Sequence, residues 1–205
     1  MKIVKSILAG LCLAFMLTSC NEQQTVPTED GNAVIENIMS RRSIRKYLAK
    51  PIDREVLNTI MECGINAPNA INRQAWEVRV IDNKEAIAKF YTALQQGNPQ
   101  AQANAIEGSF RGAPVLVIIA NDTTFNYSPL DCGIMCENIM LSAWSMGVGS
   151  VCLGSPVGYI KNSPQAMQML GFSENYEPLI CIGLGYPDET PAAKPRDMGK
   201  VKFID

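Results

Sequence analysis

The sequence of 205 residues contains no histidine. This absence excludes Ser-His-Asp and Cys-His catalysis, and it excludes metal sites that depend on imidazole ligands. The chain has seven cysteines but no Cys-x-x-Cys spacing, so a cysteine-bound zinc is an alternative without a supporting motif. We therefore expect no metal site and no catalytic side chain, and we expect a bound cofactor to carry any chemistry.

An excess of basic residues is also missing. The chain carries 18 lysines and arginines against 20 aspartates and glutamates, which gives a net charge of −2. Without Lys2 and Lys5, which lie in the N-terminal segment, 16 basic residues face 20 acidic ones. This acidic balance is not that of a nucleic-acid-binding protein, so we expect no nucleic-acid partner.

The N-terminal apolar run, Ile7 to Leu17, is only eleven residues long, whereas a membrane-spanning helix needs about 20. Lys2 and Lys5 precede this run, and Leu17-Thr18-Ser19-Cys20 follows it and resembles a bacterial lipobox. The pattern predicts a lipoprotein signal peptide over residues 1–19 and lipidation at Cys20. An ordinary signal peptide and a short membrane anchor are the alternatives. We expect a membrane-anchored lipoprotein of the bacterial cell envelope, attached through its lipid only.

Residues 20–32 are polar and include Pro27 and Gly31, which is typical of a flexible tether. Residues 33–205 then suit one domain with a sizeable core. Apolar periodicity predicts helices over residues 33–40, 53–67, 83–96, 100–110, 130–146 and 165–170. It predicts strands over residues 76–81, 115–120, 150–153 and 178–184, with a candidate edge strand over 200–204.

The cysteines of this domain lie inside apolar segments and are odd in number, so they cannot all pair. We expect buried free thiols, and for Cys152 a packing role without redox function. The five are Cys63, Cys132, Cys136, Cys152 and Cys181.

Two segments point to a phosphorylated, ring-bearing cofactor. The first places Arg41, Arg42, Ser43 and Arg45 within five residues, and guanidinium groups suit a phosphate. The second, Pro68 to Trp76, carries amide side chains and ends in an aromatic residue, which suits a flat polar heterocycle. A basic helix end, turn residues after a proline and a core tryptophan are the alternatives.

The glycines of Gly147-Val148-Gly149-Ser150-Val151-Cys152 do not form a dinucleotide-binding motif. Such a motif follows a strand and opens a helix, whereas here a helix precedes the glycines and a strand follows them. We expect a glycine that ends a helix and leads into a strand.

In this order the motifs resemble the FMN-dependent nitroreductase family. The resemblance rests on Arg41–Arg45, Ala67–Trp76, Asp131–Asn138, Gly147–Gly154, Gly183–Pro187 and Lys194–Arg196. It implies an α+β fold with a central, mostly antiparallel sheet wrapped by helices. It also implies an interwoven homodimer with FMN sites at the subunit interface.

The same resemblance assigns the cofactor-binding residues. One subunit is expected to contribute Arg41, Arg42, Ser43, Arg45, Lys194 and Arg196, together with Leu153, Gly154 and Ser155 near the flavin N5 atom. The other subunit is expected to contribute the loop residues Pro68, Asn69, Ala70, Asn72 and Gln74.

The activity that the resemblance implies is ping-pong transfer of hydride from NADH or NADPH through flavin N5. The acceptor would be a nitroaromatic, a quinone or a similar electron-poor small molecule, and residues 93–110 are expected to influence its choice. Because nicotinamide cofactors are scarce outside the cytoplasm, a second hypothesis stays open. In it, the chain is a flavin-binding or electron-relay lipoprotein without nicotinamide turnover.

Overall fold

The structure is a computed structural model that describes residues 31–204. Residues 33–205 form one compact unit. The predicted signal peptide, Cys20 and most of the predicted tether lie outside the described residues, so these assignments stay predictions. Within residues 31–204, no helix has both the length and the apolar character needed to cross a membrane.

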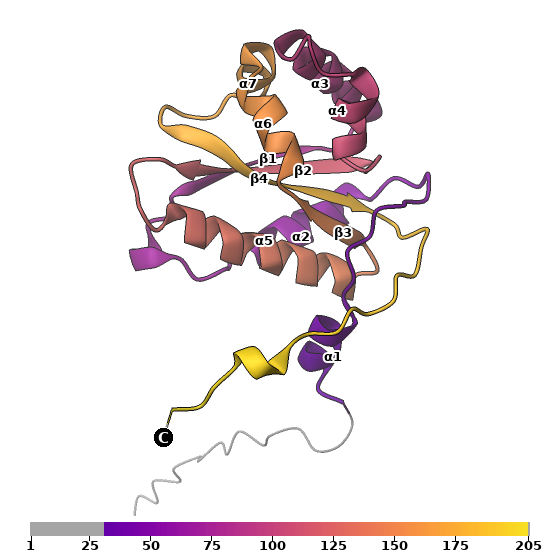
Figure 1. Cartoon of the computed structure of the whole chain (residues 1–205), viewed down its shortest axis with the longest axis vertical. Coiled ribbons are helices and arrows are strands. Elements are labelled where there is room, and N and C mark those ends of the chain that lie inside the picture. The colour runs from indigo at the N-terminus through magenta and orange to yellow at the C-terminus, as the bar shows by residue number, and fades with distance from the viewer. Residues whose placement is uncertain (1–30, 205) are drawn as a thin grey trace, which may run out of the picture. The chain divides into compact units, whose positions relative to one another are not determined.

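A four-stranded sheet with the order β1-β2-β4-β3 lies at the centre of the domain (Figure 1). Its strands are β1 (Trp76–Ile81), β2 (Val115–Asp122), β3 (Gly149–Leu153) and β4 (Tyr176–Gly185), and every neighbouring pair is antiparallel. All eight residues of β2 are buried, because this strand is internal and both of its faces are covered. The predicted α+β fold with an antiparallel sheet is confirmed.

Different sets of helices cover the two faces of the sheet (Figure 1). Helices α2 (Arg54–Ile65) and α5 (Ser128–Ser145) pack on one face, where the core includes Leu57, Ile60 and Met135. The other face carries α3 (Lys84–Gly97), α4 (Ala103–Ser109), α6 (Ser155–Lys161) and α7 (Pro164–Leu170). Its core includes Phe90 and Phe110. Alternate residues of β2 enter the two cores, as the strand period of two requires.

Helix α1 (Ala33–Ser40) lies beside the last turns of α5 and buries none of its own residues. Asn37 Nδ2 donates to the Leu141 carbonyl at 3.0 Å, and Trp144 Nε1 donates to Ser40 Oγ at 2.9 Å. Its apolar residues Val34, Ile35, Ile38 and Met39 are exposed in the single chain. The helix was predicted, and it is held beside α5 by polar contacts without a buried apolar stripe of its own.

One local prediction was wrong, and one helix was missed. The tail after Lys200 is no strand, since a 3-10 turn (Met198–Lys200) is followed by exposed residues that pair with no strand in the described chain. Helix α6 was missed, although Ser155-Pro156 is a helix-start signal.

Candidate functional site

The segment that follows α1 is fixed to the edge strand β3 by one buried residue, Ile44. The Ile44 N–H donates to the Ser150 carbonyl at 2.9 Å, and the Tyr47 hydroxyl donates to the Ile44 carbonyl at 2.6 Å. Gly149 makes room for Ile44, because a Cβ at position 149 would lie 2.7 Å from that side chain. The arginines on either side of Ile44 are therefore held at the open edge of the sheet.

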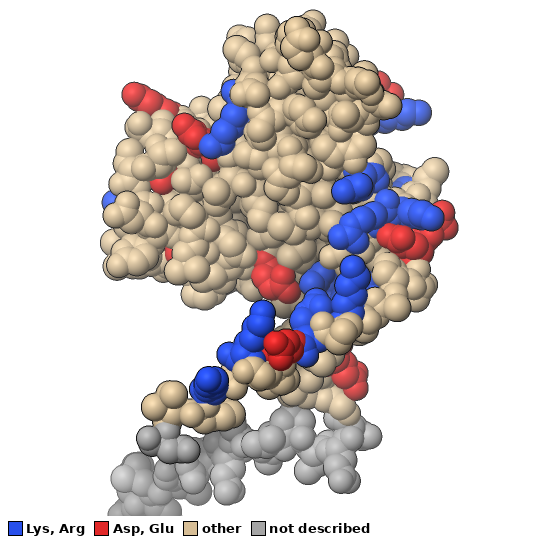
Figure 2. Space-filling model, viewed as in Figure 1, with Lys and Arg blue, Asp and Glu red and all other residues tan. Residues whose placement is uncertain are grey.

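The C-terminal tail runs alongside the same segment. The Glu189 carboxylate accepts from the Arg45 and Lys46 N–H groups, and the Asp188 N–H donates to the Lys46 carbonyl at 3.0 Å. Figure 2 shows lysine and arginine side chains gathered where this segment and the tail meet. Two parts of the chain that are about 150 residues apart in sequence thus lie side by side.

A cavity of about 490 Å³ opens between them and collects the predicted cationic residues. We call it the cationic cavity. One acidic side chain, Glu137 of α5, also lines it, so its potential is positive. The predicted residues that line it are Arg41, Arg42, Ser43, Arg45, Lys194 and Arg196.

Arg41 differs from the other cations of this cavity, because one buried nitrogen of its guanidinium group has no hydrogen-bond partner in the described chain. Its Nε lies 3.6 Å from the Glu137 carboxylate, and its side chain is only 20% exposed. Its Nη1 is buried and has no hydrogen-bond partner in the described chain. A buried guanidinium nitrogen without a partner is costly, so this atom favours an anionic acceptor in the cavity.

Other guanidinium groups of the cavity have local partners. Arg42 Nη1 donates to the Met39 and Arg41 carbonyls at 2.8 Å, which closes the end of α1. Arg45 Nη1 donates to the Ser43 carbonyl at 3.2 Å, and Arg196 Nη1 donates to the Lys194 carbonyl at 3.1 Å. Arg45, Lys194 and Arg196 are otherwise exposed. Their exposed guanidinium and ammonium groups can still reorient toward a ligand.

The second predicted segment forms a tight loop over the first turn of α5, which we call the amide loop (residues 68–75). Both oxygens of the buried Asp131 carboxylate lie 3.2 Å from the Ala70 nitrogen, and Asn69 Oδ1 accepts from the Gln74 N–H at 2.9 Å. Ser128 Oγ donates to the Ala75 carbonyl. These contacts fix the loop backbone while Asn72 and Gln74 stay exposed.

The amide loop is strained. Ile71, Asn72 and Gln74 have φ values of 51°, 54° and 51°, in the left-handed region that disfavours residues with a Cβ. Each such residue costs of the order of 1 kcal/mol, and a β-branched isoleucine costs more than an asparagine. Ile71 is also 86% exposed, so the single chain gives this side chain no compensating burial.

The structure does not bring the two groups together within one chain. The amide loop rests on Asp131 and the cationic cavity on Glu137, six residues further along α5. Six residues correspond to about 9 Å of helix. Between residues 31 and 204, no hydrogen bond or ion pair joins the loop to the cationic residues of the cavity. The binding roles assigned to both groups stay predictions.

The third predicted group lies at the end of β3. Leu153 is buried in the core on the far face of the sheet, so only its backbone is available to a ligand on the α5 side. Gly154 and Ser155 are exposed at the start of α6. A Cβ at Gly154 would meet no atom within 4 Å, so the single chain does not itself require a glycine there.

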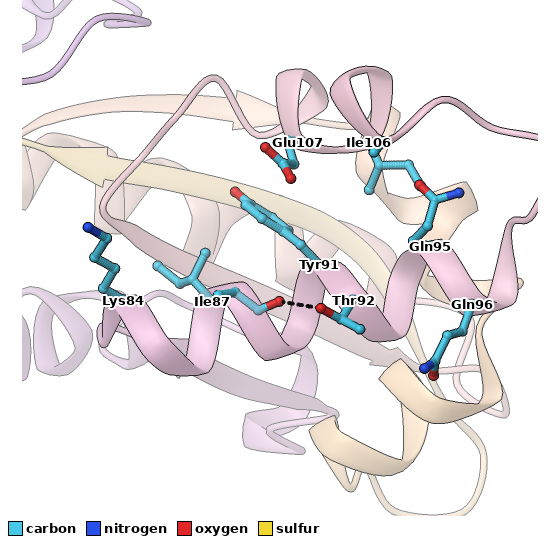
Figure 3. A pocket seen from close by; sticks show the side chains of 10 residues that line it. Lys84, Ile87, Tyr91, Thr92, Gln95, Gln96, Ile106 and Glu107 are labelled. Carbon is cyan, nitrogen blue, oxygen red and sulfur yellow. Dashed lines mark hydrogen bonds between the residues drawn. The ribbon is translucent and has the colours of Figure 1, made fainter.

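A larger cavity, about 600 Å³, lies between α3 and α4 (Figure 3). Tyr91 extends across it toward Glu107, and burial together with Glu107 raises the pKa of Tyr91 to about 12. Lys84 is the one cation of this cavity, which contains none of the predicted cofactor-binding residues. Part of segment 93–110 lines it, on the face of the sheet opposite α5. It is a poor match for a phosphorylated ligand.

Sequence reasoning missed the acidic residues that hold both groups in place. Asp131 and Glu137 are the two acidic residues of the otherwise apolar helix α5, and each contacts one group. Their isolation in an apolar helix was the available signal, because a charge there needs a partner. Glu189 had no comparable signal.

Known proteins resemble this chain in sequence and in fold. The profile of the nitroreductase family matches residues 38–186. An NADPH-flavin oxidoreductase from Vibrio harveyi is 33% identical over 187 residues, which cover 80% of this chain and 70% of that protein.

Two solved structures, both nitroreductases with bound FMN, have the same fold. The one from Desulfitobacterium hafniense has a TM-score of 0.75 and 28% identity, and the one from Bacteroides fragilis has a TM-score of 0.75 and 25% identity. Each match covers 85% of this chain and 100% of the other. A profile that spans most of the folded domain, together with this shared fold, shows that the chain belongs to the nitroreductase family.

Proposed function

We propose that the chain is an FMN-dependent oxidoreductase. It takes hydride from NADH or NADPH and passes it to a nitroaromatic, a quinone or a similar electron-poor small molecule in a ping-pong cycle. Family membership and relatives named as NADPH-flavin oxidoreductase and FMN reductase support this proposal. Bound FMN supplies the hydride-transferring atom, N5, and the protein binds and orients the reactants.

The observation that carries the proposal is Arg41, which lines the cationic cavity and whose buried Nη1 has no hydrogen-bond partner in the described chain. A phosphate monoester brings close to two negative charges and several acceptor oxygens, which satisfy both the orphaned nitrogen and the excess positive charge. Arg41, Lys194 and Arg196 would hold the phosphate, and Ser43 would donate its hydroxyl. The residues present therefore fit the phosphate end of FMN.

Arg45, Gly154 and Ser155 lie nearer the exposed edge of β3 and are assigned to the ring system. A fixed guanidinium close to the pyrimidine edge of a flavin stabilises negative charge there and so favours its reduction. The exposed N–H groups at the start of α6 can contact the ring without interference from a side chain at position 154.

We propose that the chain works as a homodimer and that the partner's amide loop completes each site. The single chain leaves Ile71, Asn72 and Gln74 exposed on a backbone whose conformation is fixed. It also leaves the apolar residues of α1 and the tail residues Phe203 and Ile204 exposed, at 89% and 91% for the last two. Exposed apolar surface of this extent is typical of a subunit interface.

The lipobox-like segment 17–20 supports a second candidate function. We propose lipidation at Cys20 and attachment to the cell envelope, where an electron-relay lipoprotein would receive electrons from a partner protein rather than from nicotinamide. Stopped-flow mixing of the purified, flavin-loaded protein with NADH separates the two candidates. Loss of flavin absorbance on a catalytic timescale supports the oxidoreductase, and its absence supports the relay.

The absorption spectrum of the purified full chain tests the cofactor assignment. We expect the native protein to be yellow and Arg41→Ala/Arg196→Ala to be colourless, with FMN affinity reduced at least ~100-fold, because two charge-assisted contacts are lost. The matched control is Arg54→Ala/Lys89→Ala, which removes two exposed cations outside the cavity and should stay yellow. A folded double variant at positions 41 and 196 that is fully loaded with FMN would refute the phosphate assignment.

A further inference from the structure

Cys152 is exposed on the edge strand β3, although its neighbours Val151 and Leu153 are buried. It lies opposite Ile182 of β4, whose side chain belongs to the core between the sheet and α5. Residues directly opposite one another in an antiparallel pair share a face of the sheet, so Cys152 faces α5. The expectation that Cys152 is a buried packing residue was therefore wrong.

Cys136 is the α5 residue that meets it. Cys136 is 3% exposed and lies in that same core. Hydrogen bonding between the two thiols shifts the pKa of each, and Arg41 and Glu137 lie close enough to act on both. One sulfur atom is thus open to solvent, and the other is protected directly behind it.

The surroundings give the two thiols different roles. The hydrogen bond from Cys136 lowers the pKa of Cys152 to about 7, with help from Arg41 and against the effects of burial and Glu137. The same hydrogen bond, together with burial, raises the pKa of Cys136, which stays protonated as the donor. Cys181, on the other face of β4, also senses the charge on Cys152, and burial raises its pKa to about 12.

We propose that Cys152 and Cys136 form a redox-active dithiol, with Cys152 as the nucleophile, Cys136 as the resolving thiol and a hydroperoxide as the oxidant. An accessible thiol beside a resolving cysteine is the arrangement of redox-sensing sites. This proposal goes beyond the flavin chemistry and does not require FMN to be bound.

The reaction balances in two steps. The Cys152 thiolate attacks the hydroperoxide, the O–O bond breaks, Cys152 becomes a sulfenic acid, and an alcohol or water leaves. The Cys136 sulfur then attacks the Cys152 sulfur, the S–O bond breaks, water leaves, and the S–S bond forms. The two thiols together lose two electrons and two protons, and one hydroperoxide is reduced.

The disulfide would tie α5 to β3 at the margin of the cationic cavity. Oxidation would also remove the thiolate charge that faces Arg41, whose guanidinium lines that cavity. The dithiol is therefore placed where its oxidation state acts on the group that we assign to phosphate binding.

Hydrogen peroxide is the probe. The reduced full chain is treated with one equivalent, blocked with N-ethylmaleimide and digested, and its peptides are identified by mass spectrometry. We expect a linked peptide pair that contains Cys136 and Cys152, in the native chain and equally in the control Cys63→Ser. In Cys136→Ser, Cys152 should instead be trapped by dimedone as a sulfenic acid.

The pH profile gives an independent readout. The alkylation rate of Cys152 should be half-maximal near pH 7 in the native chain and nearer pH 9 in Cys136→Ala, because alanine has no donor for the thiolate. The proposal fails if Cys136 and Cys152 both remain alkylatable after peroxide treatment, or if the profile of Cys152 is the same in both proteins. If the native chain purifies without flavin but still forms the disulfide, the cofactor assignment fails and the dithiol proposal stands.

Discussion

The cationic cavity and the amide loop are both held by helix α5, and they differ in how firmly they are built. The cavity joins a backbone-anchored segment to a tail whose Lys194 and Arg196 side chains are exposed. The loop is locked by a buried carboxylate and contains three non-glycine residues with positive φ. Charge attracts a phosphate over several ångströms and tolerates mobile side chains. Hydrogen bonding to the edge of a ring is directional and needs a fixed backbone.

The two groups also differ in their position along α5. Asp131 and Glu137 are separated by about 9 Å of helix. We therefore propose that a single chain presents two half-sites. In a dimer with twofold symmetry, the cavity of each protomer can meet the loop of the other.

The largest expected effect is the recovery of flavin binding when two different variant chains are expressed together. Arg41→Ala/Arg196→Ala lacks the cations, and Asn72→Ala/Gln74→Ala lacks the amide groups, so each homodimer should bind FMN poorly. A heterodimer would have one site with both defects and one intact site. Co-expression should therefore restore roughly a quarter of the native flavin content, because half of randomly formed dimers are mixed.

The measurement is the ratio of flavin to protein absorbance in the whole co-expressed population, purified through one affinity tag that both chains carry. The control is each variant purified alone under the same conditions. Recovery that never exceeds the average of the two homodimers would mean that both half-sites lie in the same chain.

A smaller effect separates the two acidic residues of α5. Asp131→Ala leaves the Ala70 N–H without its acceptor and should lower the free energy of unfolding by about 2 kcal/mol. Glu137→Ala is the matched control on the same helix, and its half-exposed ion pair should contribute at most about 1 kcal/mol. Urea denaturation at equal protein concentration measures both. Equal losses would show that the loop is no more rigidly held than the cavity.

The sequence predicted most elements because their patterns are local. β1 begins and ends where alternation in Trp76–Ile81 placed it, and α5 was identified from a long run with few charges. The meeting of Arg41 with Lys194 and Arg196 depends on tertiary pairing, such as the contact of Asp188 with Lys46, which no local pattern encodes. The resemblance to a family supplied that part. The thiol pair was missed because strand register, not composition, decides which face Cys152 occupies.

The smallest effect tests the strain in the amide loop. Asparagine tolerates the left-handed conformation that Ile71 adopts at φ 51°, so Ile71→Asn should raise the free energy of unfolding by about 1 kcal/mol. The control is Ile65→Asn in helix α2, where an exposed isoleucine lies in regular helix and asparagine should be neutral or slightly destabilising. Urea denaturation at a fixed chain concentration compares the two. A loss of stability at position 71 larger than that at position 65 would mean that the Ile71 side chain is buried by a second copy of the chain. The amide loop would then contribute apolar contact to a subunit interface as well as directed hydrogen bonds. The exposed cationic side chains of the tail would not contribute such apolar contact.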